Sequence, residues 1–273
     1  MGLAALSAFI IHQKGFPGRL NSSLKDIIAF QSYDHRPHFR SRVCFLDPDQ
    51  HGSAIDLAVC LPKTSQRKAI LWGDSAAAHL YSGLREPLQE RGYSLGQLTS
   101  SAYAPVEGLD IQQRPNCRGF NDLALPQILE EKPDLLIMAA SWPISDDLLG
   151  KLDATIAKLN GAGIRPIILG APILYRASVP AILTERLKAG NQDPFSGPDL
   201  VESYISGTDT SLRERLGSRT GVRFVSIFEA VCPSRQCPMI MNGNTPVHFD
   251  SVHLTAAGSA FFAEALLPVI TAD

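Results

Sequence analysis

From residue 68 onward, short apolar runs alternate with longer amphipathic stretches along the chain. The apolar runs predict strands at 68–73, 93–99, 134–140, 164–170 and 222–228. The amphipathic stretches predict helices at 76–91, 120–131, 146–161, 178–189, 199–216 and 255–267. Near-continuous apolar strands that alternate with helices indicate a parallel sheet with both faces covered. We therefore expect an α/β fold, a three-layer α/β/α sandwich with a doubly wound, mainly parallel five-stranded sheet.

The first 67 residues lack this alternation. Residues 1–11 (MGLAALSAFII) are apolar, but a spanning helix needs ~20 residues. The segment also lacks the charged start and the cleavage site of a signal peptide. It is either the stub of a membrane helix whose earlier part lies outside this sequence or an ordinary amphipathic helix. Residues 12–67 are interpreted as a polar linker and N-terminal extension, and 68–273 as one domain.

The composition is that of a globular protein, and the net charge does not suggest a polyanionic partner. Of the 273 residues, 45% are hydrophobic and 19% are charged, which is an ordinary globular balance. The formal net charge of −2 gives no reason to expect nucleic acid or an anionic membrane surface as a partner.

Five cysteines stand at positions 44, 60, 117, 232 and 237. They form no CxxC pair and no Cys/His cluster with the spacing of zinc ligands. One disulfide can close the short loop CPSRQC, and a second can staple the polar segment between Cys44 and Cys60. Persistent disulfides belong in an oxidising compartment, so the pattern favours an extracytoplasmic protein. The alternative is five buried thiols in a cytosolic protein.

Two short motifs carry the candidate chemistry. In AILWGDSAAAHL, Ser75 follows Gly73 and Asp74 at the end of the first strand, where it is either a nucleophile or a helix N-cap. In HFDSVHL, Asp250 and His253 are three residues apart, so the carboxylate can hold the imidazole in one tautomer. The other ring nitrogen can then take the proton of a serine, which is a poor nucleophile without such a base. Together the motifs predict a Ser–His–Asp triad.

An early GDS and a late DxxHL resemble the SGNH, or GDSL-like, hydrolases over roughly residues 68 to 270. The chain is most similar to the SGNH domain fused to acyltransferase family 3 membrane proteins, the bacterial glycan O-acyltransferases. This narrower resemblance is carried by GFPGRL after the apolar segment, by the cysteines at 44 and 60, by CRGFNDLALPQILEEKPDLLIMAASW, and by the cysteine pair ahead of DxxHLT.

The resemblance assigns roles to several residues. It implies that Ser75 is the nucleophile, that His253 is the base and that Asp250 orients it. Asp74 then braces the turn. It also makes residues 1–11 the end of the last membrane helix and residues 68–273 the SGNH catalytic domain. Disulfides Cys44–Cys60 and Cys232–Cys237 are expected, which leaves Cys117 as a free thiol.

The oxyanion hole departs from the family pattern. The wider family has a Gly-x-Asn-Asp after a central strand, but here the corresponding strand ends in AASWP. The letters GFND at 119–122 fit that pattern one strand too early, so Asn121 either points its amide at the oxyanion or caps its helix. Backbone N–H groups of Ser75 and of Ser101 (or Ser100) are the other expected donors, since the hole needs donors of any kind.

Two further side chains have two possible roles each. Trp142, at a strand end, packs around the sheet or stacks on a sugar as a substrate-binding residue. His79, one turn after Ser75, invites a second triad, although a place in the helix packing is the preferred interpretation.

The resemblance implies an extracytoplasmic (periplasmic) enzyme, associated with the membrane through a preceding transmembrane region. We expect serine-dependent transfer of an acyl group, with acetyl the expected one, to or from hydroxyls of a cell-surface glycan. The acyl donor would come from a membrane acyltransferase domain, and no metal or organic cofactor is implied. The alternatives are a stand-alone carbohydrate acetylesterase and an inactive glycan-binding module.

Overall fold

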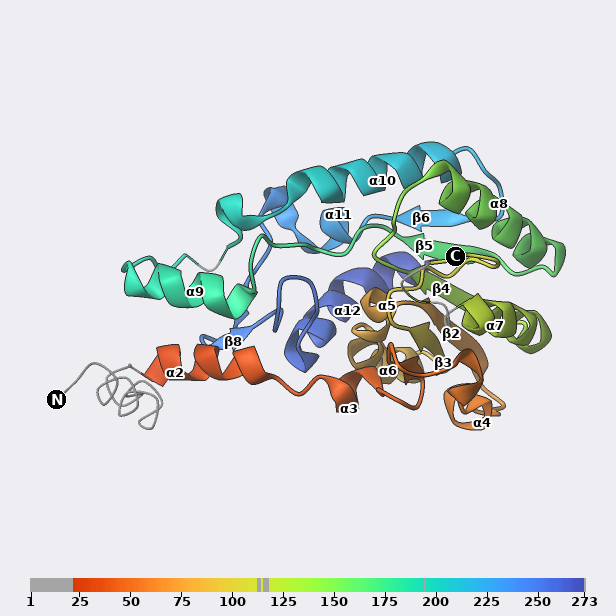
Figure 1. Cartoon of the computed structure of the whole chain (residues 1–273), viewed down its shortest axis with the longest axis horizontal. Helices are drawn as coiled ribbons and strands as arrows, with labels where there is room; N and C mark the ends of the chain where they lie inside the picture. The colour runs from red at the N-terminus through yellow and green to blue at the C-terminus, as the bar shows by residue number, and fades with distance from the viewer. Residues whose placement is uncertain (1–21, 112–113, 115–117, 194, 273) are drawn as a thin grey trace.

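The computed structural model describes residues 22–111, 114, 118–193 and 195–272. Within them, a parallel sheet of six strands has the order β1-β3-β2-β4-β5-β6. Its strands are β1 (Phe45–Leu46), β2 (Arg67–Gly73), β3 (Tyr93–Ser100), β4 (Leu135–Ala139), β5 (Pro166–Leu169) and β6 (Arg223–Val225). Helices cover both faces of this sheet, which confirms the three-layer α/β/α sandwich (Figure 1).

The helices lie close to their expected places. Those that pack on the sheet are α5 (Ser75–Ala78), α6 (Tyr81–Glu90), α7 (Arg118–Glu131), α8 (Asp146–Gly161), α10 (Glu202–Leu216), α11 (Ile227–Val231) and α12 (Ala256–Ile270). The remaining ones are α2 (Ser22–Ala29), α3 (Arg36–Phe39), α4 (Leu57–Cys60) and α9 (Val179–Lys188). One expected helix, 76–91, is divided into α5 and α6, with His79 and Leu80 between them.

Alternate residues of each central strand enter two separate hydrophobic cores. Leu71 of β2 and Ile137 of β4 pack on the face covered by α6, α11 and α12. Their neighbours Trp72 and Met138 pack on the opposite face, which α7, α8 and the last turns of α10 cover. Because both faces are buried, the strands are continuously apolar, and this is why their positions could be predicted from the sequence.

The sheet has one strand more than the five expected. Residues 45 and 46 pair in parallel with Thr99 and Ser100 of β3, so part of the N-terminal extension joins the sheet as the edge strand β1. A two-residue strand inside a polar, turn-rich segment has no periodicity from which it could be predicted.

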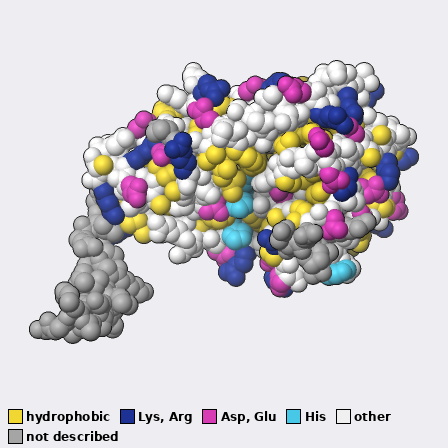
Figure 2. Space-filling model, turned by 45° about the horizontal axis from the view of Figure 1, so that its top comes forward, with side chains coloured by type: hydrophobic (Ala, Val, Ile, Leu, Met, Phe, Trp, Pro, Cys, Tyr) yellow, Lys and Arg dark blue, Asp and Glu magenta, His cyan; other side chains and the backbone are white. Residues whose placement is uncertain are grey.

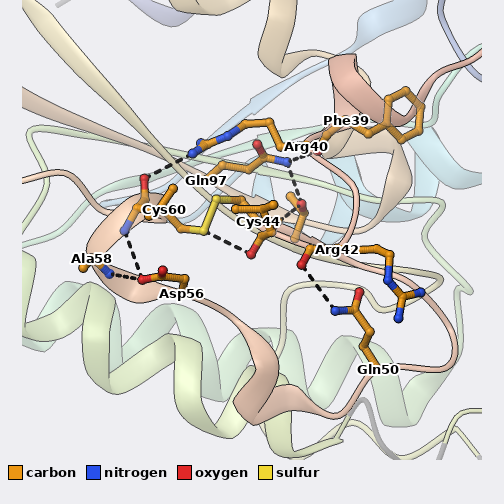
Figure 3. The surroundings of a disulfide bond; sticks show 12 residues. Phe39, Arg40, Arg42, Cys44, Gln50, Asp56, Ala58, Cys60 and Gln97 are labelled. Carbon is orange, nitrogen blue, oxygen red and sulfur yellow. Dashed lines mark hydrogen bonds between the residues drawn. A yellow bond between two sulfur atoms is a disulfide. The ribbon is translucent and has the colours of Figure 1, made fainter.

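A disulfide holds this extension in place. Cys44 and Cys60 are both fully buried and bonded to each other, which confirms this predicted pair. Around the bond, the Thr99 hydroxyl donates to the Cys44 carbonyl at 2.9 Å, and the Gln97 amide donates to the Phe39 carbonyl at 2.9 Å (Figure 3). Side chains of β3 therefore bind the backbone on the N-terminal side of the disulfide.

The second predicted disulfide, Cys232–Cys237, is also present. It closes the loop between α11 and a small antiparallel hairpin, β7 (Ile240–Met241) and β8 (Thr245–Pro246). Cys117 and residues 1–11, for which a free thiol and a membrane-helix stub were expected, lie outside the described residues. No helix of the described part is both long and apolar enough to cross a membrane.

The topology decides where a ligand can approach. Strand β2 is flanked by β3 on one side and β4 on the other, so the chain changes direction across the sheet next to it. In open parallel sheets, ligands bind beyond the carboxyl ends of the strands at such a switch point. The residues that follow β2 are Asp74 and Ser75.

Candidate active site

The turn that carries Ser75 is built from Gly73 and Asp74. A side chain on Gly73 would bring its Cβ within 1.8 Å of the Ala139 carbonyl oxygen, so only glycine permits this approach of β2 to β4. Asp74 is the N-cap of α5, and its carboxylate accepts the Ala76 N–H at 2.7 Å. Ser75 is the first residue of α5, just beyond the carboxyl end of β2, and it is half-buried.

Asp74 fixes the turn to the neighbouring strand as well. The second oxygen of its carboxylate accepts the N–H of Ser141, just after β4, at 2.9 Å. Burial raises the pKa of Asp74 to about 6, although the N–H groups of Ser141 and Ala76 partly counteract this. With both oxygens accepting backbone bonds, Asp74 braces the turn as expected.

The two predicted motifs meet at this turn. His253 Nε2 lies 2.8 Å from the Ser75 hydroxyl oxygen, across 178 residues of sequence. Its Nδ1 lies 2.6 Å from one carboxylate oxygen of Asp250. The other oxygen of Asp250 accepts the N–H groups of Val252 at 2.8 Å and of His253 at 2.6 Å. The structure thus brings Ser75, His253 and Asp250 into one hydrogen-bonded chain.

The pKa of Asp250 is lowered, as its role beside His253 in the triad requires. Partial burial raises its pKa, but the hydrogen bonds and the charge of His253, with the Val252 N–H, outweigh burial and bring the pKa down to about 2. Asp250 is therefore ionised near neutral pH and holds the proton of His253 on Nδ1. The lone pair of Nε2 then faces the serine hydroxyl, which is the arrangement that activates a serine for attack.

Aromatic side chains from both ends of the chain surround the imidazole. Phe249 stacks on His253 with 5.7 Å between ring centroids, and Phe39 of α3 meets it edge-on at 5.8 Å. Tyr33 and His35 stack in turn on Phe249. These aromatic residues could not be predicted from the sequence, because contacts between residues 33–39 and 249–253 leave no local signal.

The site is open to solvent. The side chains of His253 and Asp250 retain 25% and 39% of their exposure. Histidine side chains lie in the middle of one face, beside a group of hydrophobic side chains (Figure 2). Because the imidazole and the carboxylate are partly exposed, a molecule from solvent can reach the triad.

The expected oxyanion role of Asn121 is not supported. Its amide donates both hydrogens to backbone carbonyls, at 2.7 Å to Ala104 and 3.0 Å to Val106, and its oxygen accepts Trp72 Nε1–H at 3.0 Å. No donor of this buried side chain remains for a substrate. Asn121 also lies inside α7 and not at its N-cap, so it ties the loop after β3 to the core.

Two further expectations need correction. The Ser101 backbone N–H donates to the Leu46 carbonyl at 2.8 Å, because β1 lies beside it, so it is not available as an oxyanion donor. Trp142 is 1% exposed and donates its indole N–H to the Leu169 carbonyl at 2.9 Å. It therefore packs in the core and presents no face on which a sugar could stack.

His79 lies behind the triad and not in it. Its side chain is buried, neither ring nitrogen has a partner among the described residues, and its ring centroid is 6.2 Å from that of His253. Burial holds its pKa well below the usual range, so His79 is neutral. This agrees with the packing interpretation.

A model of the SGNH domain (fused to AT3 domains) matches residues 39–268. The chain belongs to this family. Because the matched residues start at 39, they include α3's Phe39 and strand β1 as well as the triad. The family and the geometry of the three side chains together support an enzyme that handles acyl groups, and the two disulfides agree with an extracytoplasmic location.

The solved structures to which the chain is similar include one with the same fold. The periplasmic domain of the lipopolysaccharide acetyltransferase of Salmonella ser. Paratyphi A has a TM-score of 0.73 and 20% identity to this chain, and the match covers 90% of this chain and 97% of that one. A carbohydrate acetylesterase from Sinorhizobium meliloti is more distant, with a TM-score of 0.45, 15% identity, and coverage of 75% and 98%.

One curated relative matches only in part. A porphobilinogen deaminase of Xanthomonas campestris pv. campestris is 28% identical over 127 residues. The match covers 46% of this SGNH-family chain and 38% of that protein's length. This likeness is too short and too distant to transfer an activity.

Proposed function

We propose that this SGNH domain catalyses serine-dependent transfer of an acyl group, with acetyl the expected one, to or from hydroxyls of a bacterial cell-surface glycan. The observation that carries the proposal is the chain of hydrogen bonds from Ser75 through His253 to Asp250. Membership of a family fused to AT3 domains supports the acyl chemistry. Similarity in fold to the periplasmic domain of a lipopolysaccharide acetyltransferase suggests the glycan acceptor.

The reaction runs in two halves. In the first, Ser75 Oγ bonds to the acyl carbon while its proton passes to His253 Nε2, and the leaving oxygen takes that proton as its bond breaks. In the second half, His253 takes the proton of an acceptor hydroxyl as the acceptor oxygen bonds to the acyl carbon. The bond from that carbon to Ser75 Oγ then breaks, and Oγ takes the proton back from His253 Nε2. Asp250 stays ionised throughout and stabilises the imidazolium.

The donor and the acceptor follow from this scheme. The acyl donor is supplied by a membrane acyltransferase domain on the periplasmic side, and the acceptor is a sugar hydroxyl of a surface polysaccharide. The 25% exposure of the His253 side chain suits a bulky acceptor of this kind. The same exposure admits water, so a carbohydrate acetylesterase that releases free acetate is the alternative function.

The first experiment tests the triad. Ser75→Ala should abolish p-nitrophenyl acetate turnover and labelling by a fluorophosphonate probe, with little change in the melting temperature because Ser75 lies at a turn and is only half-buried. His253→Ala should be almost as severe, since removing one member disables the unit, and Asp250→Asn should cost less than either. Near-normal turnover by Ser75→Ala would contradict the nucleophile, and a wild-type protein that is neither active nor labelled would indicate an inactive glycan-binding module.

The second experiment separates transfer from hydrolysis. The enzyme is incubated with p-nitrophenyl acetate and a bacterial surface oligosaccharide, and acetylated sugar and free acetate are measured by mass spectrometry, with Ser75→Ala as the blank. Transfer predicts acetylated sugar that increases with oligosaccharide concentration at the expense of acetate. Acetate alone at every concentration would favour the esterase.

A further inference from the structure

A positively charged pocket lies between α3 and the first turns of α6. Its volume is about 380 Å³, which is within the range of ligand sites, and it is lined by Pro37, His38, Arg40, Tyr81, Ser82 and Arg85. We call it the arginine pocket. None of the described residues that line it is an aspartate or a glutamate. In a chain with a net charge of −2, the pocket therefore attracts anions locally, although the protein as a whole does not.

The two arginines of this pocket have no acidic partner among the described residues. The Arg85 side chain is exposed, on the same face of α6 as Tyr81 four residues earlier, and it forms neither a hydrogen bond nor an ion pair with them. The half-buried Arg40 donates one N–H to the Val59 carbonyl at 3.1 Å (Figure 3), and its guanidinium carbon lies 4.8 Å from the centroid of the Tyr81 ring. Neither contact neutralises its charge. Two positive charges thus line one pocket, and an anion between them would relieve their repulsion.

The backbone of Arg40 is held in an unusual conformation. Arg40 is the residue after the end of α3, and its φ of 57° lies in the left-handed region that favours glycine. Strain of this kind is concentrated at ligand sites. Because Val59 and Tyr81 also fix the guanidinium, much of its side-chain freedom is lost before a ligand arrives, and this lowers the entropic cost of binding. Four of its five N–H groups remain for a ligand.

A row of aromatic side chains connects the arginine pocket to the triad. It consists of His38, Tyr33, Phe249 and His253, and the ring centroids of successive members are 5.7, 5.2 and 5.7 Å apart. All four side chains are partly exposed, so the row lies at the surface. Phe39, next to His38 in the sequence, meets His253 edge-on at 5.8 Å. An oligosaccharide that lies along this row reaches both the pocket and the catalytic base.

We propose that the arginine pocket binds the carboxylate or the phosphate of an acidic sugar while a hydroxyl or an acyl ester of a neighbouring sugar lies at Ser75. The proposal rests on the proposed function and makes its glycan an acidic one. Arg40 and Arg85 bind the anion, because the planar fork of a guanidinium matches two oxygens of either group. The triad acts on the uncharged hydroxyl or ester, and the pocket selects the glycan that carries it.

The first test measures binding to the full chain by calorimetry. Three oligosaccharides of equal length are compared: hyaluronan, in which alternate sugars carry a carboxylate; chitin, which is uncharged; and a phosphorylated mannan. At least one anionic oligosaccharide should bind about tenfold more tightly than chitin, with an advantage that shrinks at high salt. Which of the two binds distinguishes a carboxylate from a phosphate. Equal affinities for all three would overturn the proposal.

The second test changes the arginines. Arg85→Gln should weaken anionic binding about tenfold and keep the fold, because this side chain is exposed and has no bond to lose. Arg40→Gln should act in the same direction. Arg91→Gln is the matched control: it removes a positive charge at the end of the same helix, outside the pocket, where the guanidinium donates to the Pro87 carbonyl at 2.9 Å. Equal losses in Arg85→Gln and Arg91→Gln would show a general effect of charge and overturn the site.

The third test connects the pocket to the triad. A saturating anionic oligosaccharide should slow fluorophosphonate labelling of Ser75 in the wild type and slow it less in Arg85→Gln. An unchanged labelling rate in the wild type would overturn the proposed position of the glycan. An active Ser75→Ala variant would refute the proposed function, whereas a chain that Ser75→Ala inactivates but that shows no preference for anions would refute only the arginine pocket.

Discussion

His248 should make this protein sensitive to mild acid. The side chain is fully buried behind the triad, between Tyr175 at 5.1 Å and Phe262 at 5.7 Å, and neither ring nitrogen has a partner among the described residues. Burial lowers its pKa from 6.5 to about 3; the charge of Asp250 raises it and that of His253 lowers it, both by less than burial does.

The direction in which stability changes with pH follows from which state of the protein binds the proton. Below pH 6.5 the unfolded chain binds a proton at His248 that the folded chain does not bind until about pH 3. The free energy of unfolding therefore falls as the pH falls between these values. For a pKa of 6.5 in the unfolded state, one such histidine makes the free energy of unfolding about 2 kcal/mol lower at pH 5 than at pH 7. His79, also buried with a lowered pKa, acts in the same direction, whereas Asp74, with its raised pKa, acts in the opposite direction.

The contribution of His248 is obtained by comparing how much stability the wild type and a variant without this histidine each lose between pH 7 and pH 5. Urea unfolding of the wild type and of His248→Phe is measured at pH 7 and at pH 5, where His79, Asp74 and Asp250 titrate alike in both proteins. The wild type should lose about 2 kcal/mol more than the variant on going to pH 5, whatever the packing cost of the larger ring. If Phe does not fit between Tyr175 and Phe262, His248→Leu serves equally. Equal losses in wild type and variant would refute the reasoning.

Two further predictions concern stability. Asn121→Ala should lower the free energy of unfolding by about 2–3 kcal/mol, because it leaves Trp72 N–H and two carbonyls without partners, and its kcat should stay within a few-fold of the wild type. A hundredfold loss of kcat in a stable Asn121 variant would restore its oxyanion role. Replacing Cys44 and Cys60 together by serine should lower the free energy of unfolding by about 3 kcal/mol, the value that the chain-entropy model gives for cysteines 16 residues apart. Thermal unfolding measures this loss, and an unchanged melting temperature would show that the disulfide does not stabilise the fold.

Much of the fold was predictable because its rules are local. A parallel strand buried on both faces must be continuously apolar, so the five longer strands are visible in the sequence, and the amphipathic helices between them follow from their period. Strand β1 was not predictable, since its two residues gain their place from pairing with β3 and from the Cys44–Cys60 bond.

The triad was predictable for a related reason. Asp250 and His253 are three residues apart, Ser75 follows a strand, and the topology brings the carboxyl ends of parallel strands to one edge, so three residue types and one architectural rule suffice. The oxyanion hole has no such rule. Asn121 and Ser101 were plausible donors by residue type, but a donor can serve only one acceptor, and three-dimensional neighbours had already taken these.

The sequence by itself thus determined which residues can do the chemistry: a serine on a turn that only glycine can make, a base, and a carboxylate to orient it. The tertiary structure decided which polar groups remain available to a substrate. It buried Trp142 and Asn121 and filled their hydrogen bonds, while the side chains of His253 and Asp250 stay partly exposed. Hydrogen-bond satisfaction depends on every neighbour in space, and these neighbours come from strands and helices that are distant in sequence.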